Sequence, residues 1–198
     1  SACLFNSDGV ENTGIGYGAM VNNASGDFNS TLGTESLYTL TNGSDNVAVG
    51  HSALWTSGTG SENVAVGSNA LYAATGSGLT AVGFKALYGN TTGTNNVATG
   101  AQALTANTTG SYNTATGWKA LNSNTTGSSN TADGRQALYT NATGVENAGF
   151  GYQALYFTTS SYNTATGNQA LYSNSSGDKS TANGWRSLYF NTTGVNNS

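Results

Sequence analysis

A unit of 17 residues recurs from end to end of this 198-residue chain, and this period constrains the fold more tightly than any single residue. The unit reads Asn-x-Ala-x-Gly-x-x-Ala-Leu-Tyr-x-Asn-Thr-Thr-Gly, and the first of its two glycines falls at Gly16, Gly33, Gly50, Gly67, Gly83, Gly100, Gly117, Gly134, Gly151, Gly167 and Gly184. A fixed period is typical of proteins that stack one structural unit on the next, and this unit is too short for a helix pair or a propeller blade. The repeat therefore predicts an all-β fold, a parallel β-solenoid with one repeat per coil.

Two intervals are one residue shorter than the rest, and they test this prediction. The steps from Gly67 to Gly83 and from Gly151 to Gly167 are 16 residues long. A residue lost within a strand would move every later side chain to the opposite face, whereas a loss in a turn is harmless. Alignment of the repeats places both losses in the turn, just before Gly76 and Ser160. The strand-like segments thus keep their length throughout.

The composition favours a folded repeat over disorder. Only 7% of the residues are charged and 28 are glycine, but the chain also has 11 tyrosines, 3 tryptophans and a leucine at a fixed place in nearly every repeat. Disordered chains are usually poor in aromatic residues and strongly charged. Proline is absent, which is compatible with a continuous ladder of strands.

The repeats predict one domain over residues 1–198, with about eleven coils. The chain begins and ends within a repeat and shows no polar cap, so we expect a window on a longer fibre, or ends that partners cover. Cys3 falls at the leucine position of the first, partial repeat, where a thiol would serve as a small buried apolar group. The alternative is a lipid-anchored or cross-linking cysteine, which only the small residues Ser1 and Ala2 before it favour.

Alternation along each strand predicts which side chains enter the core. In the segment 113–117, Thr114 and Thr116 lie on one face of the strand and Ala115 lies on the other. The position of Ala115 is small in nearly every repeat, which indicates a close neighbour across a thin coil. The apolar ladder of the core is predicted to consist of Met20, Leu37, Leu54, Leu71, Leu87, Leu104, Leu121, Leu138, Leu155, Leu171 and Leu188.

One buried leucine stabilises a coil by only about 2 kcal/mol, whereas ordering the backbone costs roughly 1–2 kcal/mol per residue. Hydrogen bonds between coils and stacked asparagines add to this, but we expect further burial between chains. The outward strand face is apolar in the first half and rich in threonine in the second, and an aromatic stripe accompanies it. The residues predicted for an interface or binding face are Val47, Val49, Val64, Val66, Thr114, Thr116, Thr164, Thr166, Trp55, Tyr72 and Tyr88. The favoured assembly is a homotrimer, a rod of about 50 Å at roughly 4.8 Å per coil.

Two segments carry a family resemblance. Asn46–Ala53 (Asn-Val-Ala-Val-Gly-His-Ser-Ala) and Asn63–Ala70 (Asn-Val-Ala-Val-Gly-Ser-Asn-Ala) resemble the head repeats of trimeric autotransporter adhesins. The longer unit with Ala-Leu-Tyr-x-Asn-Thr-Thr-Gly is similar to repeats of bacterial and phage tail-fibre-like proteins. The resemblance implies a left-handed, trimeric β-roll, a location outside the cell, on its surface or on a virion, and binding to cell surfaces. The chain also departs from those families in two respects. The adhesin unit is shorter than 17 residues, and the second strand position here changes from valine to residues such as Asp133.

The sequence offers little for catalysis or for cofactors. His51 is the only histidine, on an outward position with no second histidine or cysteine nearby, so we expect no enzyme, no cofactor and no metal site. Asp45 and Glu62 share one position in successive coils, which fits an acidic patch better than an acid/base pair or a cation site. The net charge of −4, with only five Lys or Arg residues, predicts no nucleic-acid partner. No apolar run approaches the roughly 18 residues that would span a membrane, which predicts no membrane insertion of this segment.

The sequence thus predicts a non-enzymatic fibre segment that spaces or presents a receptor-binding region of an adhesin or tail-fibre-like protein. The alternative is binding of ice or of a glycan by the threonine and aromatic strand face. The paired threonines of segments 114–116 and 164–166 resemble an ice-binding ladder, although intervening coils interrupt it. Trp55, Trp118 and Trp185 could be exposed platforms for sugar rings, or could fill a seam between subunits.

Overall fold

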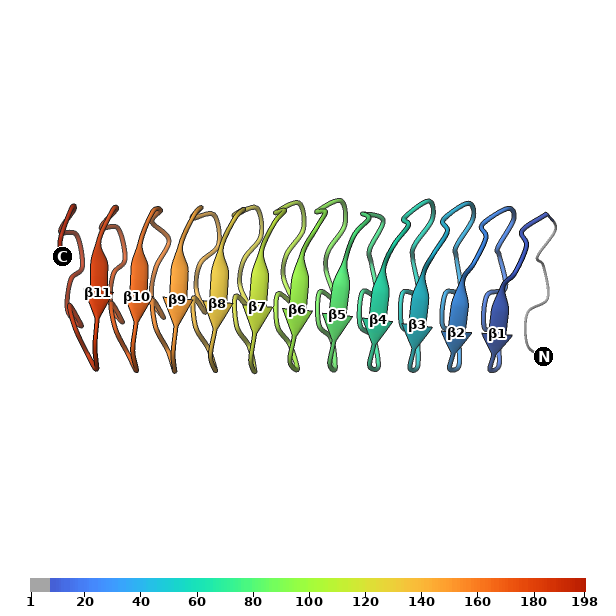
Figure 1. The fold of residues 1–198 in the computed structure, drawn as a ribbon, viewed down its shortest axis with the longest axis horizontal. Coiled ribbons are helices and arrows are strands. Elements are labelled where there is room, and N and C mark those ends of the chain that lie inside the picture. Colours follow the sequence, from blue (N-terminus) through green and yellow to red (C-terminus); the bar gives the residue numbers. More distant parts are fainter. Residues whose placement is uncertain (1–7) are drawn as a thin grey trace.

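In the computed structural model, which describes residues 8–198, each repeat contributes one strand to a single parallel sheet (Figure 1). The strands are β1 (Thr13–Ile15), β2 (Ser30–Leu32), β3 (Val47–Val49), β4 (Val64–Val66), β5 (Thr80–Val82), β6 (Val97–Thr99), β7 (Thr114–Thr116), β8 (Thr131–Asp133), β9 (Ala148–Phe150), β10 (Thr164–Thr166) and β11 (Thr181–Asn183). They stack in chain order, and the rest of each coil leads back to the next strand. The chain is therefore an all-β parallel solenoid with the predicted period. Cys3 lies outside the described residues.

Neighbouring strands pair between identical positions of the repeat. Ala48 of β3 lies opposite Ala65 of β4, and the same register continues along the sheet. The two shortened coils keep it, since Val64 pairs with Thr80 and Ala148 pairs with Thr164. This confirms that the missing residues lie in turns, where they leave the strand faces unchanged.

The turns of each coil depend on backbone conformations that neighbouring coils support. Positive φ values recur at three non-glycine positions of the repeat, as at Asp45 (φ 58), Ser52 (φ 51) and Leu54 (φ 53). Residues other than glycine, asparagine and aspartate seldom adopt this region. The amide of Ser52 donates to the Thr34 carbonyl of the preceding coil at 2.9 Å, and that of Leu54 donates to the Ala70 carbonyl of the following coil at 2.9 Å. Stacking thus fixes the bends that the repeat sequence leaves strained.

The first glycine of the repeat is required by this stacking. Gly117 has φ +121, and a Cβ atom added there would lie 2.8 Å from the carbonyl carbon of Gly134 in the next coil. No side chain fits at that distance, so the glycine column allows the coils to approach each other.

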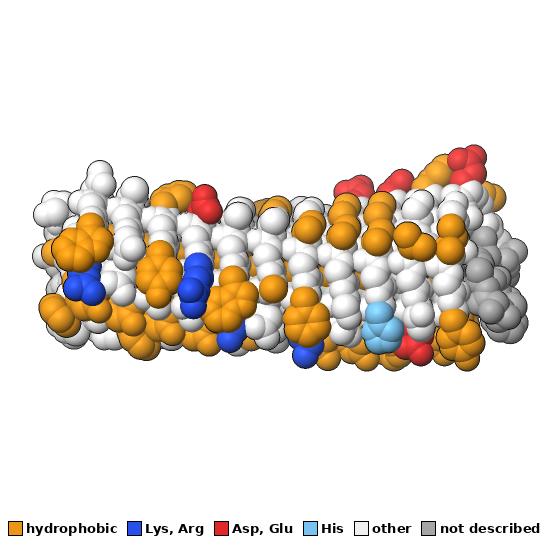
Figure 2. All heavy atoms as spheres, turned by 90° about the horizontal axis from the view of Figure 1, so that it is seen from below, with side chains coloured by type: hydrophobic (Ala, Val, Ile, Leu, Met, Phe, Trp, Pro, Cys, Tyr) orange, Lys and Arg blue, Asp and Glu red, His pale blue; other side chains and the backbone are white. Residues whose placement is uncertain are grey.

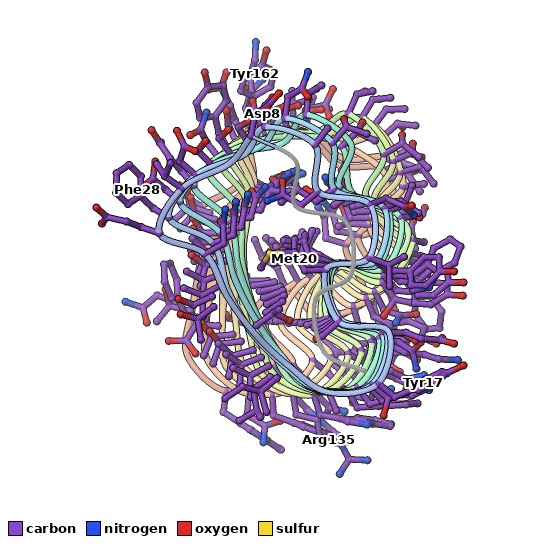
Figure 3. The ribbon with its side chains drawn as sticks, turned by 90° about the vertical axis from the view of Figure 1, so that its right-hand side faces the viewer. Asp8, Tyr17, Met20, Phe28, Arg135 and Tyr162 are labelled. Atoms are coloured by element: carbon purple, nitrogen blue, oxygen red, sulfur yellow. The ribbon has the colours of Figure 1, made fainter. Side chains whose placement is uncertain are left out.

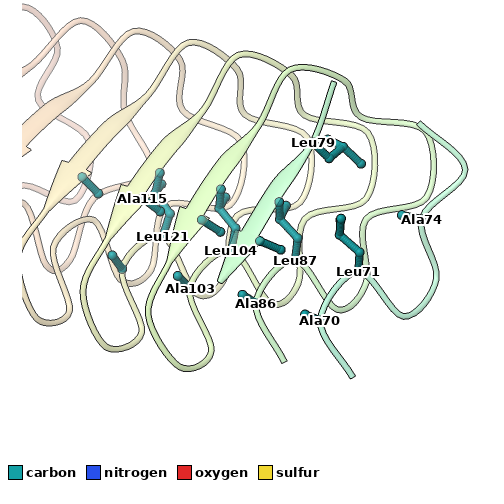
Figure 4. Packing of buried hydrophobic residues seen from close by; sticks show 14 of the residues in the cluster. Ala70, Leu71, Ala74, Leu79, Ala86, Leu87, Ala103, Leu104, Ala115 and Leu121 are labelled. Carbon is teal, nitrogen blue, oxygen red and sulfur yellow. The ribbon is translucent and has the colours of Figure 1, made fainter. Parts of the chain in front are cut away.

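The predicted leucine ladder forms the core. Met20 points into the middle of the coil in the view along the rod (Figure 3), and the leucines follow it in a row (Figure 4). All members of the predicted ladder from Met20 to Leu171 are fully buried, and Leu188 is partly buried against the same cluster. The alanine position of the strands faces this ladder closely, because a Cβ atom added at Gly149 would lie 3.3 Å from Leu138 Cδ1. The core thus consists mainly of the leucine ladder packed against the strand alanines, with Leu40 and Leu79 as further buried leucines.

A column of buried asparagines precedes the strands. Its described members with fully or almost fully buried side chains are Asn29, Asn46, Asn63, Asn96, Asn113, Asn130, Asn147 and Asn163. Asn113 illustrates the bonding: its Nδ2 donates to Asn96 Oδ1 (3.2 Å) and to the Gly127 carbonyl (2.8 Å), and its Oδ1 accepts from the amide of Asn130 (3.0 Å). The Asn113 side chain therefore joins its own coil to both neighbours.

A second buried column occupies the Asn-Thr-Thr-Gly turn. Asn107 Nδ2 donates to Asn90 Oδ1 (2.6 Å), and Asn124 Nδ2 donates to Asn107 Oδ1 (2.7 Å). The column is interrupted after Asn141, whose Oδ1 is buried without a hydrogen-bond partner. The next coil is one residue shorter and has Thr158 at this position, so no asparagine follows to donate the missing bond.

Leu104→Ala should lower the free energy of unfolding by about 2–5 kcal/mol, because it removes a fully buried side chain from a thin core. Leu188→Ala should cost clearly less, because Leu188 is only partly buried. Chemical denaturation followed by circular dichroism measures both. Equal losses would contradict the assignment of the leucine ladder as the core.

Asn113→Ala should destabilise the fold by about 1–3 kcal/mol, since it leaves the buried backbone amide of Asn130 without its acceptor and removes one of the two side-chain donors to the Gly127 carbonyl. Asn168→Ala is the matched control, because Asn168 is exposed and the same position of an earlier coil is Ala101. If both variants unfold at the same denaturant concentration as the parent, the buried column is not a source of stability.

Candidate functional site

The outward face of the strands is the first candidate surface. Its apolar members in the first six coils include Ile15 and Leu32, exposed at 58% and 52%, and Val47, Val82 and Val97, each exposed at 37%. In later coils the face becomes polar, with Thr99, Thr116, Thr166 and Asn183 at the second strand position. The face thus divides into an apolar half and a threonine-rich half.

The predicted strand-face residues fall into separate groups. Val47 and Val49 of β3 pair with Val64 and Val66 of β4, so these four valines form one apolar patch. The threonines of β7 (Thr114 and Thr116) are separated from those of β10 (Thr164 and Thr166) by strands β8 and β9.

The intervening strands interrupt the threonine ladder with unlike side chains. Asp133 pairs with Thr116 on one side and with Phe150 on the other, and Phe150 in turn pairs with Thr166. Threonine therefore does not form an extended regular array.

The aromatic stripe is a separate surface. Tyr38, Trp55, Tyr72 and Tyr88 stack face to face, with ring centroids 5.5, 5.2 and 5.0 Å apart. Each ring directly follows a core leucine, on the wall that faces the strands across the core. Trp55, Tyr72 and Tyr88 are thus on a different side of the rod from the strand-face residues, and all three are half-buried.

A second stack continues the stripe after a gap. Tyr139, Tyr156, Tyr172 and Tyr189 lie with centroid distances of 5.0, 5.2 and 4.9 Å. Between the two stacks the position is occupied by Thr105 and Asn122. The rings are spaced as closely as the coils, so the stripe stabilises the stack and leaves no room for a ligand between successive rings.

A third surface, which the sequence reasoning did not single out as a surface, lies at the residue after the first glycine. We call it the corner column; it consists of Tyr17, Thr34, His51, Ser68, Phe84, Ala101, Trp118, Arg135, Tyr152, Asn168 and Trp185. Its five Tyr, Phe and Trp side chains are exposed at 38% to 73%. Figure 2 shows large apolar side chains at regular intervals along this face, in line with the histidine. The signal in the sequence was a doubled period, with a ring in every second repeat.

The three tryptophans considered as platforms for sugar rings therefore differ in location and exposure. Trp118 and Trp185 belong to the corner column and are exposed, whereas Trp55 is held in the half-buried stack. His51 is exposed on the corner column, as expected for an outward position.

The titratable residues do not assemble into a recognisable centre. Asp45 and Glu62 lie exposed on successive coils. Within residues 8–198 no group of three or more His, Cys, Asp or Glu side chains could hold a metal ion. The same residues include no helix with the length and apolar character needed to cross a membrane.

Two tyrosines of the second stack, Tyr156 and Tyr172, have raised pKa values. Burial raises the pKa of Tyr156, and the nearby Tyr139 and Tyr152 raise it further. Burial likewise raises the pKa of Tyr172, with additional contributions from Tyr189 and Tyr156. A raised pKa means that the fold favours the neutral phenol.

The stability contributed by these phenols should be complete below pH of about 10, the ordinary tyrosine pKa, and should be lost as the pH rises through the raised values. A Tyr156→Phe/Tyr172→Phe variant keeps both rings but removes the ionisation. We expect it to lose less stability than the parent between neutral and alkaline pH, by a modest margin because both groups are partly solvated. Denaturation curves at several pH values measure this difference. An equal loss of stability at alkaline pH in the parent and in the variant would contradict the prediction.

Comparison with known proteins found no matching family model, no matching curated protein and no matching solved structure.

Proposed function

We propose that this chain is a non-enzymatic structural rod, a shaft or head segment of an adhesin or tail-fibre-like protein that spaces or presents a receptor-binding region. The observation that carries the proposal is the uninterrupted sheet of 11 strands, all paired in one register. Such a sheet has one repeated contact and no hinge between coils, which suits a rigid spacer. The resemblance of the repeats to adhesin heads and tail fibres supports an extracellular, cell-surface or virion location.

We further propose that three copies associate through the apolar half of the strand face, with each coil winding left-handed. Ile15, Leu32, Val47 and Val97 expose apolar surface on the strand face of the first six coils, and we call this surface the apolar band. Contiguous exposed apolar surface usually marks an interface, and a second and third copy of the same rod match this band in length and register. The Asn-Thr-Thr-Gly turns then face the solvent.

Ice binding by the threonines of the strand face receives less support. An ice-binding surface needs a regular, flat array, whereas Asp133 and Phe150 lie between the two threonine pairs. A purified segment without thermal hysteresis and without ice shaping would agree with the fibre role.

Light scattering after size exclusion tests the fibre role and the assembly. We expect a native mass near three times the 20.0 kDa of one chain, with an elongated shape in small-angle X-ray scattering. A globular monomer would contradict both the rod and the shared interface.

A triple variant, Val47→Thr/Val64→Thr/Val66→Thr, should shift this mass toward the single chain. Threonine occupies the same positions in β7, so the variant keeps the coil while making the band polar. Val195→Thr is the matched control, because Val195 is exposed but lies off the strands. An unchanged mass for the triple variant would place the interface elsewhere.

A further inference from the structure

The corner column carries a ring in every second coil. Tyr17, His51, Phe84, Trp118, Tyr152 and Trp185 alternate with Thr34, Ser68, Ala101, Arg135 and Asn168. The single-coil period of the fold does not require this alternation, since small or polar side chains occupy the same position in the intervening coils. The doubled period is therefore a property of the surface and not of the core.

The spacing of the rings matches a repeating ligand. Two coils rise by roughly 9.6 Å, because adjacent parallel strands are about 4.8 Å apart. This distance is close to the length of one disaccharide unit in an extended β-1,4-linked polysaccharide. Aromatic rings bind the apolar faces of sugars, so successive rings would meet successive disaccharides of one chain running along the rod.

Positive charge accompanies the rings in the second half of the molecule. The Lys119 ammonium lies 4.6 Å from the Trp118 ring centre, and the Arg135 guanidinium lies 5.0 Å from Trp118 and 5.6 Å from Tyr152. Lys85 lies 5.3 Å from Phe84, and Arg186 lies 5.0 Å from Trp185. Four of the chain's five Lys and Arg residues thus flank four rings of the corner column. We call this surface, from Phe84 to Trp185, the basic stripe.

A row of side-chain amide groups lies beside the rings of the basic stripe. In the position beside the corner column, Gln153 Nε2 donates to Gln136 Oε1 (3.2 Å) and Gln169 Nε2 donates to Gln153 Oε1 (3.0 Å). The chain of amides ends at Arg186, whose Nε donates to Gln169 Oε1 (2.9 Å). Such a row offers donors and acceptors at the spacing of the coils, which suits the hydroxyl groups of sugars.

The charge distribution selects an acidic ligand. The net charge of the chain is −4, and six of its nine acidic residues lie before Phe84, whereas all five Lys and Arg residues follow it. In the coils that contain β5 to β11, Asp133 is the only acidic side chain on the strand face, the corner column or the amide row beside them. The basic stripe therefore stands out against an acidic chain and would attract a polyanion locally.

We propose that the basic stripe, from Phe84 to Trp185, binds an extended β-1,4-linked polysaccharide of uronic acids, in which each sugar carries a carboxylate. The rings take the sugar faces, the Lys and Arg side chains pair with the carboxylates, and the amides bond the hydroxyls. This inference goes beyond the role of a rod, because a spacer needs no doubled period on its surface.

Isothermal titration with oligomers of β-1,4-linked mannuronate tests the proposal. Affinity should rise from the disaccharide to the octasaccharide, because only the longer chain reaches all four rings, and it should fall as salt is added. Cello-oligosaccharides of equal length, which are neutral, should bind at least about tenfold more weakly, as should polyglutamate, which has the charge but no sugar faces. Equal binding of either compound, or no dependence on length, would overturn the proposal.

Two variants separate the stripe from the fold. The first is Trp118→Ala/Tyr152→Asn, and the second is Lys119→Gln/Arg135→Ala. Each new residue already occurs at the same position of another coil, so both variants should fold. Each should weaken octasaccharide binding by roughly tenfold or more, as expected when binding hot spots are removed. Tyr112→Asn/Tyr162→Asn is the matched control, because both tyrosines are exposed on a different column.

Unchanged binding by either stripe variant, or an equal loss in the control, would overturn the proposal. The native mass of each variant should equal that of the parent. The two proposals can therefore fail separately. A lack of sugar binding would leave the proposed rod unaffected, whereas an error in the proposed rod would appear in the native mass and the shape.

Discussion

The structure depends on hydrogen bonding between identical positions of successive coils. Each strand has only three residues, so one coil alone makes few contacts of its own. Stacking supplies the rest: Ser52 and Leu54 donate to opposite neighbours, and Asn113 bonds to the coils on both sides. Because every inner coil both donates hydrogen bonds to its two neighbours and accepts hydrogen bonds from them, the fold is cooperative only as an array.

The glycine and asparagine columns follow from this constraint. Gly117 allows the backbone of the next coil to approach, and the buried asparagines satisfy carbonyl and amide groups that the turns leave inside the rod. Where a coil loses one residue, the turn column fails at Thr158 and a buried acceptor on Asn141 stays unpaired. The strand column continues past the same coil through Asn147 and Asn163, which explains why the register is kept.

Much of the fold could be predicted from the sequence, because a repeat converts a weak local pattern into many observations of one pattern. The period fixed the solenoid, the position of Leu104 fixed the core, and the alternation around Ala115 fixed the strand face. The positive φ of every leucine in the ladder could not be predicted, because it arises from contacts between coils and not from the propensity of leucine. Trp55 was predicted to belong with the strand face, but in the closed coil it follows Leu54 on the opposite wall, which local alternation along a strand could not indicate.

The surfaces have different roles in the proposed account. The apolar strand band is suited to self-association, the stacked tyrosines to stability, and the corner column to a ligand with a repeat of its own. The resemblance to fibre repeats supports the proposed handedness and assembly, as it supports the proposed fibre role.

Exchange of the asparagine side-chain amide protons, measured by nuclear magnetic resonance, tests the central claim of a hydrogen-bonded stack most directly. The account predicts slow exchange for Asn113 and Asn130, whose amides are buried and bonded between coils, and fast exchange for the exposed Asn95 and Asn168. Equally fast exchange at all four residues would contradict the account, because the columns that join the coils would then be open to water.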